Sequence, residues 1–268
     1  MSEPLAIAVT GAAGRMGQSV IRVAAEEGAR VVGALDRSES SAIGRDAGEV
    51  AGAGTLGVVV SPDLGSALLG AACVVDFSGA GAVSLLAFAA ARAGVALVVG
   101  TTGLGDDAMR ALDKAAEKVP VLVSPNMSLG VHVLADLVRA AVQALPGYDV
   151  EIVETHHRRK VDAPSGTALR LLDAVKEART VRPIYGREGK PGARTDDEVA
   201  VLAMRGGDVI GDHTVHLLGP GDRLELTHRA TGRDLFARGA IAAAHVIAAK
   251  KPGRYTMADV VAARVAAG

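Results

Sequence analysis

Cysteine is almost absent from this sequence. Cys73 is the only one among 268 residues, so no disulfide bond can form within the chain. It stands in the apolar run 71–75, where a cysteine usually serves as a small buried hydrophobic side chain. The disulfide-stapled folds of small secreted proteins are therefore excluded.

Aromatic residues are scarce as well, with no Trp, three Tyr and three Phe. Hydrophobic residues still make up 49% of the chain, so the apolar content comes mainly from Ala, Val and Leu, accompanied by 33 glycines. Small aliphatic side chains of this kind suit close packing of helices against a sheet. A chain of this length has room for one large or two modest domains.

Net charge and long hydrophobic runs are also lacking. Lys and Arg number 29 against 30 Asp and Glu, a formal net charge of -1, which argues against nucleic-acid binding. The longest stretch without charge, 119–135, contains Pro125, Asn126 and Gly130 and does not resemble a membrane span. The first residues lack the basic segment of a secretory signal. We expect a cytoplasmic protein that binds neither nucleic acid nor membrane.

The first half of the chain alternates short Val-rich runs with helical stretches. Runs without polar alternation are typical of strands buried on both faces. Their alternation with helices predicts an α/β fold with a doubly wound parallel sheet, that is, a Rossmann-like domain. Strands are expected at 5–9, 31–35, 58–60, 73–77, 95–99 and 121–123, and helices at 16–27, 64–69, 81–92 and 106–118.

The second half has a different texture. Its strands alternate polar and apolar residues, which predicts an open sheet with one exposed face, able to pack against a copy of the same chain. The segment 179–197 contains several Gly and Pro residues, which predicts a long surface loop. Strands are expected at 148–155, 198–204, 213–218 and 223–227, helices at 128–145, 165–178 and 235–249, and a short element at the end.

A glycine-rich turn, 11–17, joins the first expected strand to the first helix. Its glycines allow a tight turn and a close approach of the backbone to a pyrophosphate at the helix N-terminus. Asp36 ends the second strand, where an acidic residue hydrogen-bonds ribose hydroxyls. Asp36 favours NAD, but Arg37 and Arg15 could pair with a 2′-phosphate. We therefore predict use of both NADH and NADPH.

Three more turns follow expected strands, at 77–79, 100–103 and 124–128. Ligands of doubly wound sheets bind at the carboxyl ends of the strands, so these turns are predicted to wall a nicotinamide pocket. The candidate cofactor-binding residues are Gly11, Ala12, Gly14, Arg15, Met16, Gly17, Asp36, Arg37, Phe77, Gly100, Thr101, Thr102, Ser124, Asn126 and Met127.

The densest group of functional side chains lies at 156–168. Two imidazoles, two guanidiniums and an ammonium fall within five residues, His156–Lys160. Histidine exchanges protons near neutral pH, and Lys160 adds a compact positive charge. Ser165, Gly166 and Thr167 open a predicted helix, whose N-terminal N–H groups favour an anion. The group suits a small, doubly anionic substrate that must receive a proton.

Two points about this basic run stay open. A basic run is often a solvated surface or a nucleic-acid patch. Adjacent residues of an extended segment face opposite sides, so only one of His156 and His157 can face a reacting carbon, and their spacing does not choose between them.

His213 and His216 lie on opposite faces of an expected strand. Two histidines placed in this way are poorly arranged to bind one zinc ion, and no metal site is predicted.

With these motifs assembled, the chain resembles the dihydrodipicolinate reductase (4-hydroxy-tetrahydrodipicolinate reductase) family of the bacterial and plant lysine pathway. The resemblance rests on the segments 11–17, 100–103, 154–168 and 205–213, which span nearly the whole chain in the family's order. The run His-His-x-x-Lys-x-Asp-x-Pro-Ser-Gly-Thr is the most specific of them. One departure is Gly79-Ala80-Gly81-Ala82, where some members carry a longer or more polar loop.

The resemblance implies NAD(P)H-dependent reduction of a cyclic imine dianion to tetrahydrodipicolinate. It implies a dinucleotide domain of residues 1–127 and 236–268, and an inserted α+β domain, 128–235, that binds substrate and forms a homotetramer through its open mixed sheet. His156 is then the general acid, with Lys160 beside it in catalysis. Substrate binding falls to His157, Ser165, Gly166, Thr167 and Thr101.

Two other functions remain as alternatives. A dehydrogenase of another small amino-acid-derived acid or semialdehyde shares the two-domain plan but does not need the histidine-lysine motif. A redox-sensing module that holds NAD(P) without turnover should lack both a proton donor and an anion cradle. This sequence carries both features, which favours the reductase.

Overall fold

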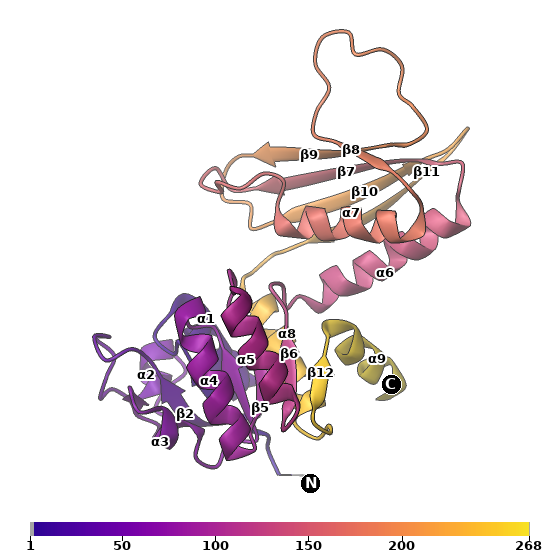
Figure 1. The fold of residues 1–268 in the computed structure, drawn as a ribbon. Helices are drawn as coiled ribbons and strands as arrows, with labels where there is room; N and C mark the ends of the chain where they lie inside the picture. The colour runs from indigo at the N-terminus through magenta and orange to yellow at the C-terminus, as the bar shows by residue number, and fades with distance from the viewer. Residues whose placement is uncertain (1–2, 268) are drawn as a thin grey trace. The chain divides into compact units, whose positions relative to one another are not determined.

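The chain leaves its first structural unit after Ser128 and returns to it at Asp234 (Figure 1). The second unit, Leu129–Arg233, is therefore inserted into the first. The computed structural model describes residues 3–267.

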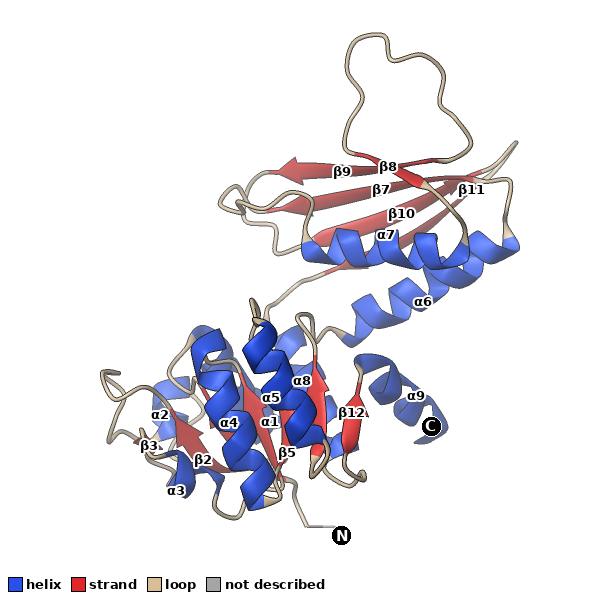
Figure 2. Cartoon of the chain, in the orientation of Figure 1, coloured by secondary structure: helices blue, strands red, loops and turns tan. Residues whose placement is uncertain are grey.

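A parallel sheet of seven strands, in the order β12-β6-β5-β4-β1-β2-β3, forms the centre of the first unit. Helices α4 and α5 pack together on one face and α1 and α8 on the other, so β4 and β5 are wholly buried (Figure 2). The predicted Rossmann-like sheet is confirmed. Its strands are β1 (Ala6–Thr10), β2 (Arg30–Leu35), β3 (Val60–Ser61), β4 (Cys73–Asp76), β5 (Ala96–Val99), β6 (Pro120–Val123) and β12 (Gly253–Tyr255).

The helices of this unit bury one side each. In α1 the buried Val20, Ile21 and Ala24 recur at the three- and four-residue spacing of a helical face. In α5 Leu112 and Ala115 do the same. The helices are α1 (Arg15–Glu26), α2 (Ala47–Ala51), α3 (Leu64–Leu68), α4 (Ala80–Ala93), α5 (Asp106–Ala116), α8 (Asp234–Ile247) and α9 (Met257–Ala267).

Two parts of this unit differ from the sequence prediction. Helix α2 was not expected; it is one short turn of helix whose N-terminal N–H groups are capped by the Asp46 carboxylate. The short terminal element expected after residue 249 is in fact the edge strand β12, paired with β6, followed by α9. Helix α2 has five residues and strand β12 three, too few to show the hydrophobic periodicity by which an element is recognised in a sequence.

The second unit holds a mixed sheet of five strands in the order β11-β10-β7-β9-β8. Strand β7 alternates buried and partly exposed residues along its whole length, because α6 and α7 cover only one face of the sheet. The predicted open mixed sheet is confirmed. Its elements are α6 (Leu129–Ala144), β7 (Asp149–His156), α7 (Gly166–Ala178), β8 (Arg182–Ile184), β9 (Glu198–Arg205), β10 (Asp212–Leu218) and β11 (Arg223–Arg229).

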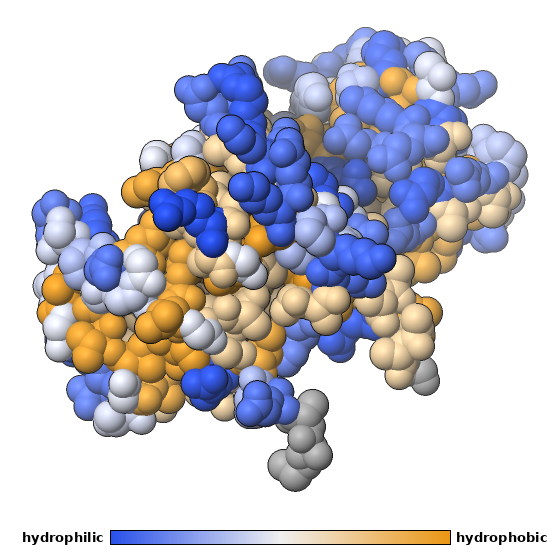
Figure 3. All heavy atoms as spheres, turned by 60° about the horizontal axis from the view of Figure 1, so that its bottom comes forward, coloured by the Kyte–Doolittle hydropathy of each residue, from blue (hydrophilic) through white to orange (hydrophobic). Residues whose placement is uncertain are grey.

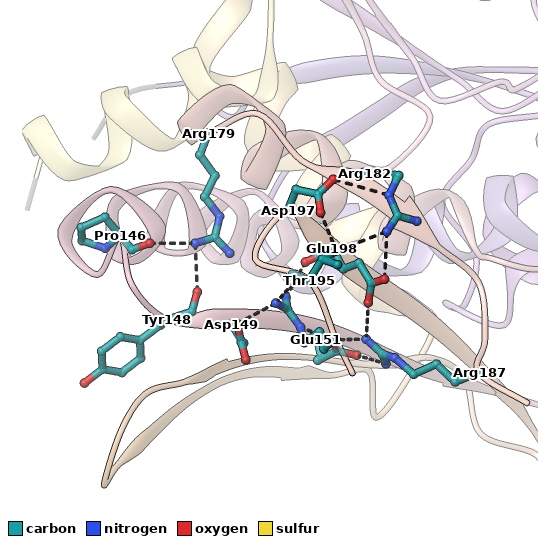
Figure 4. A network of polar contacts seen from close by, with 11 residues as sticks. Pro146, Tyr148, Asp149, Glu151, Arg179, Arg182, Arg187, Thr195, Asp197 and Glu198 are labelled. Atoms are coloured by element: carbon teal, nitrogen blue, oxygen red, sulfur yellow. Dashed lines mark hydrogen bonds and ion pairs between the residues drawn. The ribbon is translucent and has the colours of Figure 1, made fainter. Parts of the chain in front are cut away.

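The segment 179–197, expected to be a loop throughout, contains the edge strand β8. Pro183 stands in its middle, which an edge strand tolerates because one side of it needs no ladder hydrogen bond. The rest of the segment is fastened to the sheet by arginines (Figure 4). Arg187 makes a two-pronged ion pair with Glu151, and Arg194 pairs with Asp149.

The surface of the first unit carries hydrophobic side chains, which gather on the face shown in Figure 3. In this unit Leu69, at the end of α3, and Leu85 and Phe88, on α4, are each more than half exposed. Among the described residues, none of the helices is both long and apolar enough to cross a membrane.

Candidate active site

The turn between β1 and α1 is built so tightly that only glycine fits at two of its positions. A Cβ on Gly17 would lie 2.1 Å from the carbonyl oxygen of Gly11, and Gly11 itself adopts a φ of 71°. The first turn of α1 therefore packs directly on the end of β1. Its N-cap, Gly14, offers no side-chain cap and no acidic residue follows in the first turn, so the helix start favours an anion.

Asp36 organises the same turn from the end of β2. Its carboxylate accepts hydrogen bonds from the backbone N–H of Ala13 at 2.7 Å and of Arg37 at 2.9 Å. Ala12 donates its N–H to the carbonyl of Leu35 and is fully buried. These contacts place the Asp36 carboxylate beside the glycine turn. A carboxylate that is to accept hydrogen bonds from the ribose of a bound dinucleotide needs this position.

A cavity of about 530 Å³ opens at the carboxyl ends of β4, β5 and β6, beside the start of α1. It takes in seven of the residues predicted from the sequence, while the glycines of the turn, Asp36, Arg37, Ser124 and Asn126 are outside its lining. The predicted residues that line it are Arg15, Met16, Phe77, Gly100, Thr101, Thr102 and Met127. Ser78, Gly79 and Pro125, which also line it, belong to the turns predicted to wall the pocket, whereas Ala80 and Phe236 were not predicted.

A buried carboxylate holds the walls of this cavity together. Asp76, with no exposed surface, accepts hydrogen bonds from the hydroxyls of Thr10 at 2.5 Å and Thr101 at 2.6 Å. Ser78 donates to the same carboxylate through both its hydroxyl and its N–H. The ring of Phe77 packs on Gly100, where a Cβ would meet the ring at 2.2 Å. Asp76 thus joins the ends of three neighbouring strands.

The turn after β6 is shaped by its own side chains. The Ser124 hydroxyl donates to the carbonyl of Asn126 at 2.6 Å, and the Asn126 side chain accepts the N–H of Ser128 at 2.8 Å. Met127 is buried, and its carbonyl lies against Gly239 of α8. Ser124 and Asn126 therefore give this wall its shape and present Met127 to the cavity.

In the second unit, strand β7 ends at His156 and turns its side chain to the buried face. His156 is 8% exposed, and Glu154, two residues earlier on the same face, has no exposed surface. Nδ1 of His156 lies 2.6 Å from Oε2 of Glu154. His157 leaves the strand, and its N–H donates to the carbonyl of Val209.

Glu154 stays ionised despite its burial. Burial opposes its charged form, but hydrogen bonds from Arg205, His156 and the N–H of Ser165 outweigh this and hold the pKa of Glu154 below its usual value. Since a carboxylate only accepts hydrogen bonds, the proton between the two side chains belongs to Nδ1 of His156. Nε2 is then the ring nitrogen that can exchange a proton with a ligand.

Space beside Nε2 is kept open by a glycine. A Cβ on Gly211 would lie 2.9 Å from Nε2 of His156. The ring of His213 stands edge-on to that of His156, with centroids 5.1 Å apart. Burial, followed by repulsion from His156, lowers the pKa of His213 to about 4, so His213 is neutral at physiological pH.

The predicted anion-binding residues follow within twelve positions of His156. Lys160 makes an ion pair of 2.8 Å with Asp162, which lowers the pKa of that carboxyl. Ser165 caps α7: its hydroxyl accepts the N–H of Ala168 and lies 3.1 Å from Nε2 of His213. Gly166 is exposed in the first turn, whose N–H groups point out of the helix.

Sequence reasoning missed Glu154, Arg205 and His213 as partners of the predicted site. Glu154 could have been found, because alternation along β7 puts positions 154 and 156 on one face. Arg205 and His213 come from other strands, and their approach depends on a strand register that the sequence does not reveal. Among the described residues, no cluster of three or more His, Cys, Asp or Glu could hold a metal ion.

Comparisons with known proteins agree with one another. Residues 5–127 match the family described as "Dihydrodipicolinate reductase, N-terminus", and residues 130–261 match "Dihydrodipicolinate reductase, C-terminus". The chain is 52% identical to a 4-hydroxy-tetrahydrodipicolinate reductase of Anaeromyxobacter dehalogenans over 96% of this chain and 98% of that one. It is 47% identical to the enzyme of that name from Methanopyrus kandleri, with 96% of each chain covered.

A solved structure shares the fold. Dipicolinate-bound dihydrodipicolinate reductase from Paenisporosarcina sp. TG-14 superposes with a TM-score of 0.78 at 23% identity, over 96% of this chain and 98% of that chain. GenD2 from gentamicin A biosynthesis, solved in complex with NAD, gives a TM-score of 0.61 at 17% identity, over 98% and 91% of the two chains.

Proposed function

The chain belongs to the dihydrodipicolinate reductase family, and from this we infer that it reduces 4-hydroxy-tetrahydrodipicolinate to tetrahydrodipicolinate in lysine and diaminopimelate biosynthesis. It is an oxidoreductase that uses a pyridine nucleotide. In the net reaction one hydride and one proton enter the substrate and one water leaves it. The observation that carries the proposal is the Glu154-His156 pair, followed in the chain by Lys160 and the capped start of α7.

The first unit suits a dinucleotide. The Gly11–Gly17 turn and the uncapped start of α1 would hold the pyrophosphate, and Asp36 would accept from the ribose. The cavity lined by Phe77, Thr101 and Met127 would take the nicotinamide. A bound reduced nicotinamide supplies the hydride.

The second unit suits a small dianion that accepts a proton. Hydride addition at the conjugated carbon leaves an enamine, and the neighbouring carbon must then be protonated. His156 is the proton donor: Nδ1–H is engaged with Glu154, so Nε2–H is the acid. His157 is the alternative left open by the sequence, but its ring lies outside the Glu154 contact.

Lys160 and the start of α7 bind the carboxylates. On substrate arrival Lys160 exchanges its ion pair with Asp162 for one with the substrate, a swap that keeps its charge neutralised throughout. Ser165, Gly166 and Thr167 present the helix N-terminus to a carboxylate. His157 and Thr101 complete the proposed set of substrate-binding residues.

Both NADH and NADPH are proposed as donors. Asp36 accepts from the ribose of NADH, while exposed Arg37 and the cavity-lining Arg15 offer cations to the 2′-phosphate of NADPH. The proposed assembly is a homotetramer formed through the uncovered face of the second unit's sheet, and the proposed location is the cytoplasm. Size-exclusion chromatography with light scattering tests the first of these.

One assay tests the function directly. The purified protein is coupled to the synthase that makes the substrate from pyruvate and aspartate semialdehyde, and loss of NADH or NADPH absorbance is followed. Oxidation should depend on both the synthase and this protein. Absence of oxidation with either nucleotide would overturn the assignment, and a preference above about a thousandfold would overturn dual use alone.

A further inference from the structure

We propose that Glu154, clamped by Arg205, is a positioning residue for the proposed reduction: it fixes the proton of His156 on Nδ1 and so makes Nε2 the atom that protonates substrate. This proposal rests on the proposed function for its kinetic consequence. Its structural basis is a single carboxylate shared by the acid, an arginine and the anion-binding turn.

The contacts of Glu154 leave it no freedom. Oε2 receives Nδ1–H of His156 at 2.6 Å and one guanidinium nitrogen of Arg205 at 2.8 Å. Oε1 receives the other guanidinium nitrogen at 2.8 Å and the N–H of Ser165 at 3.0 Å. Both oxygens are thus saturated by donors, and the charged fork of Arg205 makes the strong bidentate contact typical of arginine and carboxylate.

Charge balance explains why Arg205 is needed. A carboxylate with no exposed surface is costly to bury unless it is paired. Arg205 lies opposite His156 in the parallel register of β7 and β9, so it reaches Glu154 from the neighbouring strand. The positive charge of Arg205 offsets the negative charge of Glu154, so the buried carboxylate stays paired and faces His156 as an anion.

The same pair ties the acid to the substrate-binding turn. Arg205 also donates to the carbonyl of Asp162 at 2.7 Å, and Glu154 holds the N–H of Ser165, the cap of α7. The segment between Lys160 and the helix start is therefore fastened at both ends to the group that aims His156. A substrate carboxylate at this turn is placed by the contacts that place the acid.

The other groups around His156 do not compete for this role. From β10, His213 faces it edge-on and is neutral because its pKa is lowered to about 4. From the following turn come Lys160 and Asp162, which pair with each other. Gly211 stands beside Nε2 without a side chain. Glu154 is the anion in contact with the ring.

The tautomer of His156 gives a test that needs no substrate. Long-range ¹H–¹⁵N correlation of the histidine rings, assigned by the loss of one signal in His156→Asn, should show neutral His156 protonated at Nδ1. A neutral ring protonated at Nε2 would overturn the proposal. The tautomer is read from the parent protein without substrate, so failure of the reductase assignment does not affect this result.

Kinetics give the second test. Glu154→Gln should lower kcat by about 10²-fold or more while KM changes far less, because the acid is no longer aimed. The matched control is Glu151→Gln on the same strand, whose partner Arg187 makes the same two-pronged contact away from the site.

Arginine variants separate positioning from bulk stability. Arg205→Lys keeps the charge but loses the fork, and kcat should fall at least about tenfold, whereas Arg187→Lys should leave it unchanged. Equal kcat for parent, Glu154→Gln and Arg205→Lys would overturn the proposal. A parent that shows the Nδ1 tautomer but does not reduce the substrate would instead overturn the proposed function.

Discussion

The hydroxyl of Thr101 donates a hydrogen bond of 2.6 Å to the buried carboxylate of Asp76 and so joins the ends of β5 and β4. Through this bond, and those from Thr10 and Ser78, the walls of the cofactor cavity are set by one side chain that does not line the cavity itself. The pocket's shape is therefore sensitive to a residue behind it.

Asp76→Asn should weaken NADH binding about tenfold and lower stability by about 1–3 kcal/mol. The amide keeps one acceptor and replaces the other with a donor, so a buried hydroxyl loses its acceptor. Fluorescence titration with NADH and thermal unfolding measure the two effects. Asp63→Asn, an exposed helix cap in the same unit, is the control for nucleotide binding. Unchanged affinity in Asp76→Asn would contradict this reading of the pocket.

His156→Ala should lower kcat by about 10²–10⁴-fold, the usual contribution of a general acid. The dissociation constant of NADH should stay at the parent value, because His156 belongs to the second unit and the cofactor residues to the first. Steady-state kinetics and a nucleotide titration on one preparation check both. A variant that retains parental kcat would remove His156 from the mechanism.

Lys160→Ala should raise KM and lower kcat together, each by about tenfold or more, since the lysine both holds the dianion and offsets its charge in the transition state. Lys176→Ala, an exposed lysine of α7 that faces Asp173, should change neither. The comparison is made at low ionic strength, where an exposed charge would have its largest effect. A change in KM alone would assign Lys160 to binding only.

Stability should depend on pH through His213. Its folded pKa of about 4 lies below the ordinary value of 6.5, so the unfolded chain binds more protons between these limits. His213 then contributes stability above pH 6.5 that is lost as pH falls toward 4, by about 3 kcal/mol at most. The lowered pKa of Glu154 acts as pH falls through and below the ordinary value of 4.5, so it overlaps only the acid end of this window.

Denaturant unfolding at several pH values checks the effect of His213. His213→Gln should flatten the dependence between pH 4 and 6.5, while His216→Gln, half-exposed on the same strand, should keep it. Equal slopes for both variants would show that burial of His213 does not control this range.

Asp36→Asn should shift the preference toward NADPH about tenfold or more, measured as the ratio of kcat/KM with the two nucleotides. The amide removes the charge that repels a 2′-phosphate and still accepts the N–H of Ala13. Arg37→Ala should shift the ratio the other way. Identical ratios in parent and Asp36→Asn would mean that the ribose lies elsewhere.

The sequence predicts the fold well where periodicity is long. Val-rich strands and amphipathic helices such as α1 can be recognised from their hydrophobic pattern. Strands β8 and β12 have three residues each, too few to show such a pattern. For the candidate site, the motif residues and the glycine turn are visible because their neighbours in the chain are their neighbours in space.

Partners brought by strand pairing are not visible in this way. Arg205 lies 51 positions after Glu154, and His213 48 positions after Ser165, and only the order of strands in the sheet brings them together. Asp76 is similar, because its role depends on hydroxyls from two neighbouring strands. The sequence shows which side chains can donate or accept hydrogen bonds. It does not show the strand order and register that bring a donor next to its acceptor.

The insertion of one unit into the other has a consequence for biosynthesis. On the ribosome, residues 129–233 emerge before α8 and β12. The inserted unit is therefore complete while the parallel sheet still lacks strand β12. During that interval β6 is an unprotected edge, open to pairing with another nascent chain. A premature stop after Ile247 would make that exposure permanent, so such a product should aggregate rather than accumulate as a shortened enzyme.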